Sequence, residues 1–319
     1  MFKNLFYSFV LCVLAFTACS TSRHVNQDAQ AVLPDTTRLA NALLWKISHP
    51  DIKHDSYLYG TIHIITDEDY FLPAGTEIAM EKTDKFVFEI DMKEMMDLGA
   101  QISMITKAFM KNGTRLSDLI SDDDYAMVEK HFEDIGLPMM MLDRIKPMFL
   151  TVFASSDISP GDISSGEMKS YEMEFFEFAK ENEKETGGLE TIEFQLSVFD
   201  SIPYVAQAEM LVESIRAEDE QNDIFQQMIE LYRSQDVEAL YNAIGDEETG
   251  TGEYEDILVR NRNQRWMAGM HEFMKTGPTF FAVGAGHLGG PNGVIRLLRK
   301  EGFVVAPVLE QGGRQVRKF

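Results

Sequence analysis

The chain has 319 residues, of which 45% are hydrophobic, enough for one large domain or two small ones. Its net charge of -23 argues against a nucleic-acid-binding function, because the phosphates would be repelled by such a surface. The same charge argues against flat binding to anionic lipid and is compatible with attraction of a divalent cation.

The N-terminus predicts export and a lipid anchor. Lys3 precedes an apolar run over residues 5–17, which is too short to span a bilayer but has the length of a signal-peptide core. The run ends in Ala18-Cys19, which resembles a bacterial lipobox, although Phe16 stands where Leu is usual. We expect a lipoprotein signal peptide over residues 1–19 and lipidation of Cys19, which would be the protein's one contact with the membrane. The alternative is ordinary secretion with cleavage nearby.

The expected location is the cell envelope, as an outer-membrane lipoprotein of a Gram-negative bacterium, because Ser20 is not the Asp that favours retention in the inner membrane. Residues 20–40 are polar and aperiodic, which predicts a flexible tether. A single domain is expected over residues 41–319. Cys12 and Cys19 are the only cysteines, so this domain would contain no disulfide bond.

A strand–helix–strand unit is expected near the start of the domain. Residues 56–60 and 84–91 have strand patterns, and residues 74–83 between them have a helical pattern. His63 follows the first strand, and Glu89 and Asp91 end the second. We expect these side chains at the carboxyl ends of parallel strands, where open α/β sheets bind ligands.

The C-terminal region repeats this plan. Residues 279–283 are expected to form a strand, residues 294–298 a helix and residues 303–306 a second strand. His287 follows the first of these strands in Gly284-x-x-His287, the same spacing as Gly60-x-x-His63. Two such motifs favour one site built from two halves, with the imidazoles as metal ligands. Between the two units, residues 92–153, 164–182 and 200–242 have a helical character.

This donor set suits Zn²⁺, Mn²⁺ or Co²⁺ with room for a water molecule. Glu89 is either a ligand or the general base, and the sequence leaves both roles open. A thiol hydrolase is excluded, because the mature domain has no cysteine beyond its lipidated end. The absence of Gly-x-Ser-x-Gly argues against a serine hydrolase.

Six stretches in order resemble the TraB/GumN family, which is related to the Tiki proteases and more distantly to ChaN-like and erythromycin-esterase-like proteins. The resemblance extends from about residue 43 to residue 308. The stretches are Tyr59-Gly60-Thr61-Ile62-His63, Phe88-Glu89-Ile90-Asp91, Gly188-Leu189-Glu190-Thr191-Ile192-Glu193-Phe194-Gln195, Phe199-Asp200-Ser201-Ile202-Pro203, Arg262-Asn263-Gln264-Arg265-Trp266 and Val283-Gly284-Ala285-Gly286-His287-Leu288.

The resemblance implies an α/β fold: a central, mainly parallel sheet from two pseudo-symmetric βαβ halves, with a large helical insertion between them. It also implies that the active members are metal-dependent hydrolases, which cleave peptide bonds in the Tiki branch. By position, His63, Glu89 and His287 match the family's metal and catalytic residues, and Arg262 and Asn263 match a polar pair in the same cleft.

Other residues of these stretches are candidates for supporting roles. Arg262 is a candidate to stabilise an oxyanion, and Glu193 to orient a ligand. Glycines let the backbone approach a bound group closely, so three are assigned to cofactor binding. The glycines are Gly60, Gly284 and Gly286, and the residues expected behind the ligands are Asp91, Glu190, Glu193 and Gln195.

The expected function is therefore that of a divalent-metal-dependent hydrolase acting on a peptide or protein substrate from a lipid tether. The alternative is a non-catalytic lipoprotein that binds haem or iron through a histidine, as a ChaN-like protein would. A regulatory role in export or polysaccharide assembly is a third possibility.

Overall fold

The computed structural model describes residues 37–154, 168–219, 224–244 and 252–309. The expected signal peptide, Cys19 and most of the expected tether lie outside the described residues. Leu39, within the last part of that tether segment, is already buried in the core, and Arg38 pairs with Asp236. In the described ranges, no helix has both the length and the apolar character that a membrane crossing needs.

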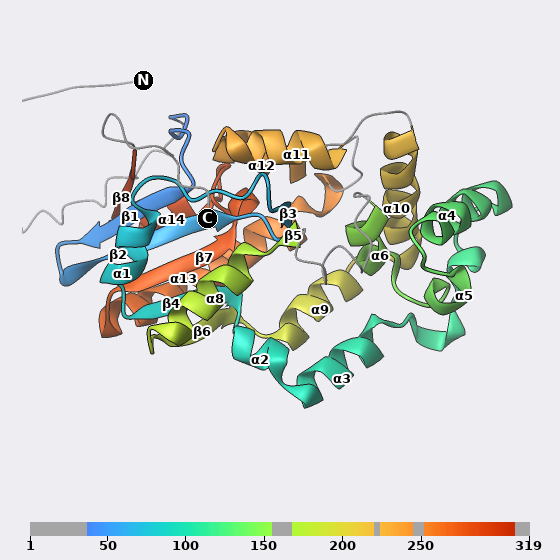
Figure 1. Ribbon diagram of the computed structural model, residues 1–319, viewed down its shortest axis with the longest axis horizontal. Helices are drawn as coiled ribbons and strands as arrows, with labels where there is room; N and C mark the ends of the chain where they lie inside the picture. The colour runs from blue at the N-terminus through green and yellow to red at the C-terminus, as the bar shows by residue number, and fades with distance from the viewer. Residues whose placement is uncertain (1–36, 155–167, 220–223, 245–251, 310–319) are drawn as a thin grey trace, which may run out of the picture. The chain divides into compact units, whose positions relative to one another are not determined.

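A six-stranded sheet lies at the centre of the fold (Figure 1). Strands β6, β4, β7 and β2 are parallel to one another, whereas β1 is antiparallel to both of its neighbours, β2 and β8. The expected α/β fold with a mainly parallel sheet is confirmed. The order is β6 (Glu185–Glu190), β4 (Lys85–Ile90), β7 (Thr279–Gly284), β2 (Ile52–Thr61), β1 (Leu44–His49) and β8 (Val304–Pro307).

Strand β7 lies between β2 and β4, so the C-terminal unit inserts a strand into the N-terminal unit. Thr61 of β2 is in register with Gly284 of β7, which brings the two Gly-x-x-His motifs side by side. Because the two strands are parallel, His63 and His287 leave the sheet at the same edge. Carboxyl ends of neighbouring parallel strands form the usual ligand site of such sheets.

Both expected strand–helix–strand units are present. The first consists of β2, α1 (Thr76–Lys82) and β4, and the second of β7, α14 (Val294–Lys300) and β8. Their second strands pair differently, since β4 is parallel to β7 and β6 while β8 is antiparallel to β1. A pseudo-twofold relation between the halves therefore remains a prediction.

The stretch between the two units is mainly helical, but not wholly so. It supplies the edge strand β6, and β5 (Met168–Lys169) pairs with β3 (Ile65–Thr66) in residues expected to be helical. Strand β6 contains Gly187-Gly188, which obscures a strand pattern. A Cβ at Gly188 would collide with the backbone nitrogen of Asp91, so a glycine is needed for the approach of β6 to β4.

The remaining helices of the described chain all lie between β4 and β7, apart from the short turn η6 that follows β7. They are α2 (Met92–Met96), α3 (Leu98–Ala108), η1 (Lys111–Gly113), η2 (Leu116–Asp118), α4 (Asp122–Asp134), α5 (Met139–Leu142), α6 (Pro147–Ala154), α8 (Tyr171–Glu181), α9 (Ile192–Asp200), α10 (Tyr204–Asp219), α11 (Ile224–Arg233), α12 (Val237–Ile244), η4 (Gly252–Tyr254), η5 (Asp256–Arg260), α13 (Asn261–Thr276) and η6 (Ala285–His287).

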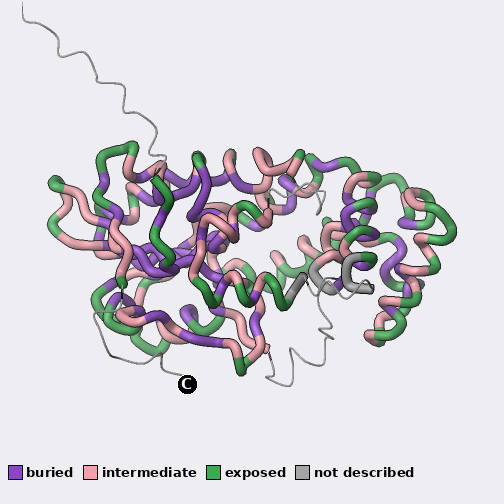
Figure 2. Tube along the Cα trace, turned by 90° about the horizontal axis from the view of Figure 1, so that it is seen from above, coloured by how far each residue is buried: buried purple, intermediate pink, exposed green. Residues whose placement is uncertain are grey.

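Helices cover both faces of the sheet, with α1 and α8 on one face and α13 and α14 on the other (Figure 1). The buried residues concentrate along the strands (Figure 2). On the α8 face, the rings of Tyr59, Phe175 and Phe280 lie 5.0–6.0 Å apart. A second apolar cluster joins α4, α5, α6 and α10.

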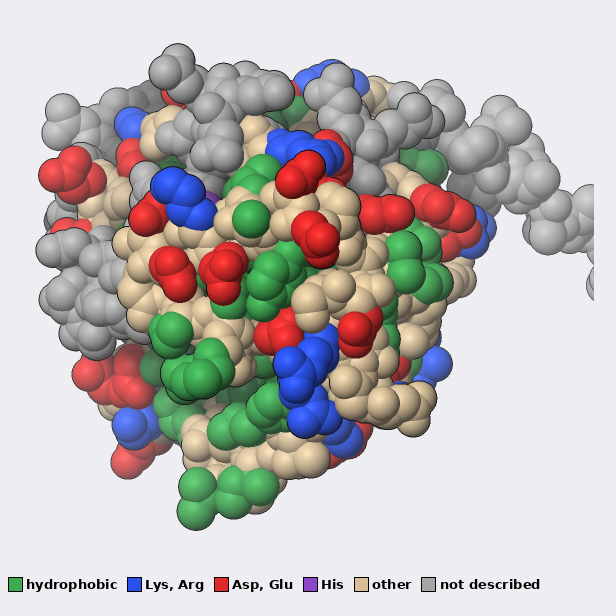
Figure 3. All heavy atoms as spheres, turned by 90° about the vertical axis from the view of Figure 1, so that its right-hand side faces the viewer, with side chains coloured by type: hydrophobic (Ala, Val, Ile, Leu, Met, Phe, Trp, Pro, Cys, Tyr) green, Lys and Arg blue, Asp and Glu red, His purple; other side chains and the backbone are tan. Residues whose placement is uncertain are grey.

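On the face shown in Figure 3, patches of hydrophobic side chains are interspersed with both acidic and basic ones.

Candidate active site

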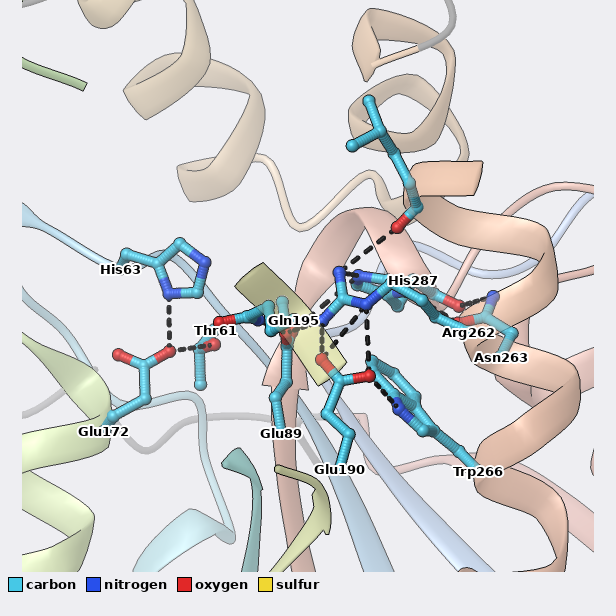
Figure 4. A network of polar contacts seen from close by, with 12 residues as sticks. Thr61, His63, Glu89, Glu172, Glu190, Gln195, Arg262, Asn263, Trp266 and His287 are labelled. Atoms are coloured by element: carbon cyan, nitrogen blue, oxygen red, sulfur yellow. Dashed lines mark hydrogen bonds and ion pairs between the residues drawn. The ribbon is translucent and has the colours of Figure 1, made fainter. Parts of the chain in front are cut away.

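A pocket of about 640 Å³ opens at the carboxyl ends of β2, β4 and β7. His63, Glu89 and His287 all line it, together with Arg262 and Gln195. These residues come from two strand ends, two helices and the turn after β7. The pocket therefore brings together side chains that the sequence separates widely (Figure 4).

His287 is buried and held in one orientation by Asn263, which lies on α13. The amide nitrogen of Asn263 donates to the carbonyl oxygens of His287 and Asn292, at 3.1 and 2.9 Å. The Oδ1 atom of Asn263 must therefore face the Nδ1 atom of His287, which lies 2.6 Å away. This contact places a proton on Nδ1 and leaves a lone pair on Nε2.

The imidazole of His287 is neutral near pH 7. Burial lowers its pKa to about 3, and the nearby Arg262 guanidinium acts in the same direction against the opposing effect of Glu89. The Nε2 atom accepts a hydrogen bond of 3.1 Å from Nη1 of Arg262. A neutral imidazole binds a metal ion through this same lone pair, so an ion at Nε2 would replace the hydrogen bond from Arg262.

Glu89 lies at the end of β4, and its carboxylate is surrounded by donors. Oε1 accepts from the backbone nitrogen of Gly284 at 2.9 Å, and Oε2 accepts from Arg262 and, at 3.3 Å, from Gln195. Burial by itself would raise the pKa of Glu89, but the Arg262 guanidinium, the two nearby histidines and the Gly284 N–H together outweigh burial and hold this pKa well below its usual range. Glu89 is therefore ionised, and its Oε1 lies 3.8 Å from Nε2 of His287.

Arg262 connects the polar groups of this cluster. Its Nε and Nη2 atoms donate to both carboxylate oxygens of Glu190, and its Nη1 donates to the carbonyl oxygen of Leu258 as well as to His287. With the bond from Nη2 to Glu89, each of the five N–H groups of the guanidinium has a partner. This geometry favours a positioning role for Arg262 over the expected oxyanion role, because no donor is left for substrate.

Glu190 supports Arg262 from behind. Strand β6 ends at Glu190, whose side chain is buried and also accepts a 3.0 Å hydrogen bond from Nε1 of Trp266. The indole ring of Trp266 lies 4.5 Å from the imidazole of His287, between centroids. Two buried carboxylates, Glu89 and Glu190, therefore share one guanidinium, which leaves one negative charge without a paired cation in this cluster.

His63 lies in the same pocket but with different partners. Its side chain is 72% exposed, and its Nδ1 atom is 3.0 Å from Oε1 of Glu172. Thr61 donates to the same oxygen at 2.7 Å, and Ser170 donates to the other oxygen at 3.0 Å. The charge of Glu172 raises the pKa of His63 to about 9, so this imidazole is protonated at neutral pH.

Sequence reasoning missed Glu172, Thr61 and Trp266. Glu172 stands in the first turn of α8 among other acidic residues, so nothing in its local sequence distinguishes it from a residue that favours a helix start. Thr61 stood inside the first Gly-x-x-His motif, directly after Gly60. The one sequence signal for a role of Thr61 in the site was its position between Gly60 and His63 of the motif.

The other predicted residues are placed as follows. Asp91 caps α2 by accepting from the backbone nitrogen of Lys93. Glu193 is exposed and lies 3.7 Å from Lys107, outside the pocket lining. The glycines pack against protein: a Cβ at Gly60 would lie 3.0 Å from Ala285, and one at Gly286 would overlap Ile244 of α12. Gly284 differs, because its nitrogen binds Glu89 directly.

In the described parts of the chain, no three His, Cys, Asp or Glu side chains are arranged to hold a metal ion as they stand. His287 and Glu89 supply two donor atoms of suitable type and protonation state, and His63 lies in the same pocket with its Nδ1 paired to Glu172. The residues fit a divalent cation by chemistry and by charge, because a cation would balance the unpaired carboxylate of the cluster.

Comparisons with known proteins agree on one family. The chain is 22% identical to Metalloprotease TIKI2 of Danio rerio over 93% of its own length and 67% of the relative. It is 25% identical to Metalloprotease TIKI1 of Homo sapiens over 97% of its own length and 69% of the relative. The chain thus spans about two thirds of the length of these curated relatives, and no solved structure matches it. The model of the TraB/PrgY/gumN family matches residues 43–307, and the chain therefore belongs to this family.

Proposed function

We propose that this protein is a divalent-metal-dependent hydrolase that cleaves peptide bonds. The observation that carries the proposal is the pair formed by neutral His287 and ionised Glu89, with donor atoms 3.8 Å apart, in a cluster with one unpaired negative charge. Relatives named as metalloproteases support the same chemistry. Mn²⁺, Co²⁺ and Zn²⁺ are all candidates, since imidazole and carboxylate suit each of them.

His287, Glu89 and His63 are the residues that would hold the ion. A bound divalent cation lowers the pKa of its water ligand and polarises a carbonyl group. Asn263 fixes the ring of His287 so that Nε2 faces Arg262 and Glu89, and Arg262 helps to keep Glu89 ionised. His63 must lose its proton to become a ligand, so uptake of metal should release a proton below pH 9.

We also propose that the domain is anchored to the envelope through a lipidated Cys19, at the outer membrane. The lipobox-like sequence supports this location. A pocket at the end of a tether would act on substrates near the membrane surface.

The test uses the purified full chain after removal of metal with a chelator. Metal analysis and calorimetric titration with Mn²⁺, Co²⁺ and Zn²⁺ measure affinity, and a peptide library measures cleavage. We expect binding of one ion per chain and cleavage that a chelator abolishes. The variants His287→Ala and His63→Ala should each lose metal binding and cleavage, because each substitution removes an imidazole that would hold the ion.

Glu89→Gln distinguishes the two roles of this carboxylate. If Glu89 is the general base, the variant keeps its metal and loses about a hundredfold or more in activity; if it is a ligand, the metal is lost as well. Glu209→Gln, an exposed change on α10, is the matched control and should behave as wild type. Stoichiometric haem binding that requires a histidine, together with no cleavage under any metal, would reject the hydrolase and favour the haem-binding alternative.

A further inference from the structure

The pocket lining outside the polar cluster, here called the apolar wall, is strongly apolar. Besides the polar residues already described, its lining consists mainly of aliphatic, aromatic and thioether side chains. Methionine contributes four of them, from three helices, and thioether side chains adapt to ligands of different shape. These residues are Met92, Met95, Met173 and Met228.

Two of these methionines are accessible from the pocket. Met95 on α2 is 36% exposed and Met173 on α8 is 39% exposed, whereas Met92 is buried in the core. Helices α2 and α8, which carry these two side chains, contact each other, so Met95 and Met173 line the pocket from neighbouring helices. Glu172, the partner of His63, directly precedes Met173 in the first turn of α8 and also lines the pocket.

We propose that this wall binds a large apolar side chain of the peptide substrate, of the size of Leu, Met or Phe, beside the polar cluster. Met95 and Met173 are then specificity-determining residues. The inference rests on the proposed function and adds the substrate class to it. It needs no covalent step of its own.

Two physical effects produce this preference. Exposed thioether surface becomes buried against an apolar side chain, which is favourable, whereas a polar side chain would lose its water without gaining a partner. An acidic side chain would lose still more hydration than a neutral polar one, because a carboxylate is charged. The expected order of substrates is therefore apolar, then polar, then acidic.

The experiment compares peptides that differ at one position beside the cleaved bond, with Leu, Met, Phe, Ser or Glu. For the metal-loaded full chain we expect kcat/KM to be about 10- to 100-fold higher with Leu, Met or Phe than with Ser, the range that an apolar pocket provides. The difference should reside mainly in KM. Glu should give the lowest value.

Met95→Gln and Met173→Gln keep side-chain length and make the wall polar. Together they should reduce the preference for Leu over Ser, measured as the ratio of the two kcat/KM values, by about tenfold. Met140→Gln is the matched control, because Met140 is 92% exposed on α5 and does not line the pocket. A preference that is absent in wild type, or unchanged in the double variant, overturns the inference and leaves the hydrolase intact.

A second measurement separates this inference from the proposed function. Fluorescently labelled Leu and Ser peptides are titrated into the chelator-treated chain, where no cleavage occurs. Tighter binding of the Leu peptide that is lost in the double variant supports the apolar wall even if no metal-dependent cleavage is found. Equal binding of the two peptides, or no binding, overturns it.

Discussion

Lowering the pH should reduce the free energy of unfolding of this protein through His287, and a variant can separate this effect from those of other titrating groups. The pKa of His287 is about 3 in the folded state and near 6.5 in the unfolded state, because burial opposes its protonation. Between these values the unfolded chain binds one proton more than the folded chain at this position, so the free energy of unfolding decreases as the pH falls. We expect a loss of about 1.7 kcal/mol between pH 6.5 and pH 5 from this residue alone.

In this pH window the other groups of the pocket contribute less than His287. The pKa of His63 is raised to about 9 by Glu172, so the folded chain keeps this proton throughout, while the unfolded chain gains about half a proton between pH 6.5 and pH 5; His63 therefore adds a smaller slope of the opposite sign. The pKa of Glu89 is lowered in the folded state, mainly by Arg262, and its contribution disappears only as the pH falls below about 4.5. Between pH 5 and 6.5, His287 should therefore give the largest slope among these three groups, and comparison with a variant that lacks this imidazole isolates it.

The measurement is urea unfolding of the full chain at pH 5, 5.5, 6 and 6.5, with a chelator present. His287→Asn retains an N–H group for Asn263 but cannot titrate, so it should lose about 1.7 kcal/mol less than wild type over this range. His54→Gln is the control, because the imidazole of His54 lies 2.7 Å from the backbone carbonyl of Met274 and does not line the pocket. Equal slopes for wild type and His287→Asn would refute the assignment of a neutral buried imidazole.

Three further changes test other parts of the structure. Glu172→Gln should lower the pKa of His63 from about 9 toward 6.5, because the paired charge disappears; an NMR titration that shows no shift would contradict this pairing. Gly284→Ala should displace the carboxylate of Glu89, since the added Cβ would lie 3.2 Å from its Oε1, and reduce metal affinity about tenfold or more in calorimetry. Cys19→Ala should release the protein from membranes, and a variant that still fractionates with them would reject the lipid anchor.

The sequence was sufficient to predict the parallel sheet, because strands β2, β4 and β7 are short buried runs whose pattern is local. The sequence also indicated that His63, Glu89 and His287 lie at the carboxyl ends of these strands. Strand β6 was not predicted, since Gly187-Gly188 has low strand propensity and its place depends on a close approach to β4. Glu172 and Trp266 were missed for a similar reason: their roles come from the packing of α8 and α13 against the sheet, which no local pattern encodes.

The position of β7 between β2 and β4 has a consequence for folding. The backbone nitrogen of Thr279 binds the hydroxyl of Ser56, across a separation of 223 residues. Because β2 and β4 do not pair with each other, the central sheet cannot close until the chain beyond residue 279 is present. Contacts between such distant segments form late and slow folding. A nascent or truncated chain would thus lack the pocket altogether, so any activity would arise only after synthesis of the last strands.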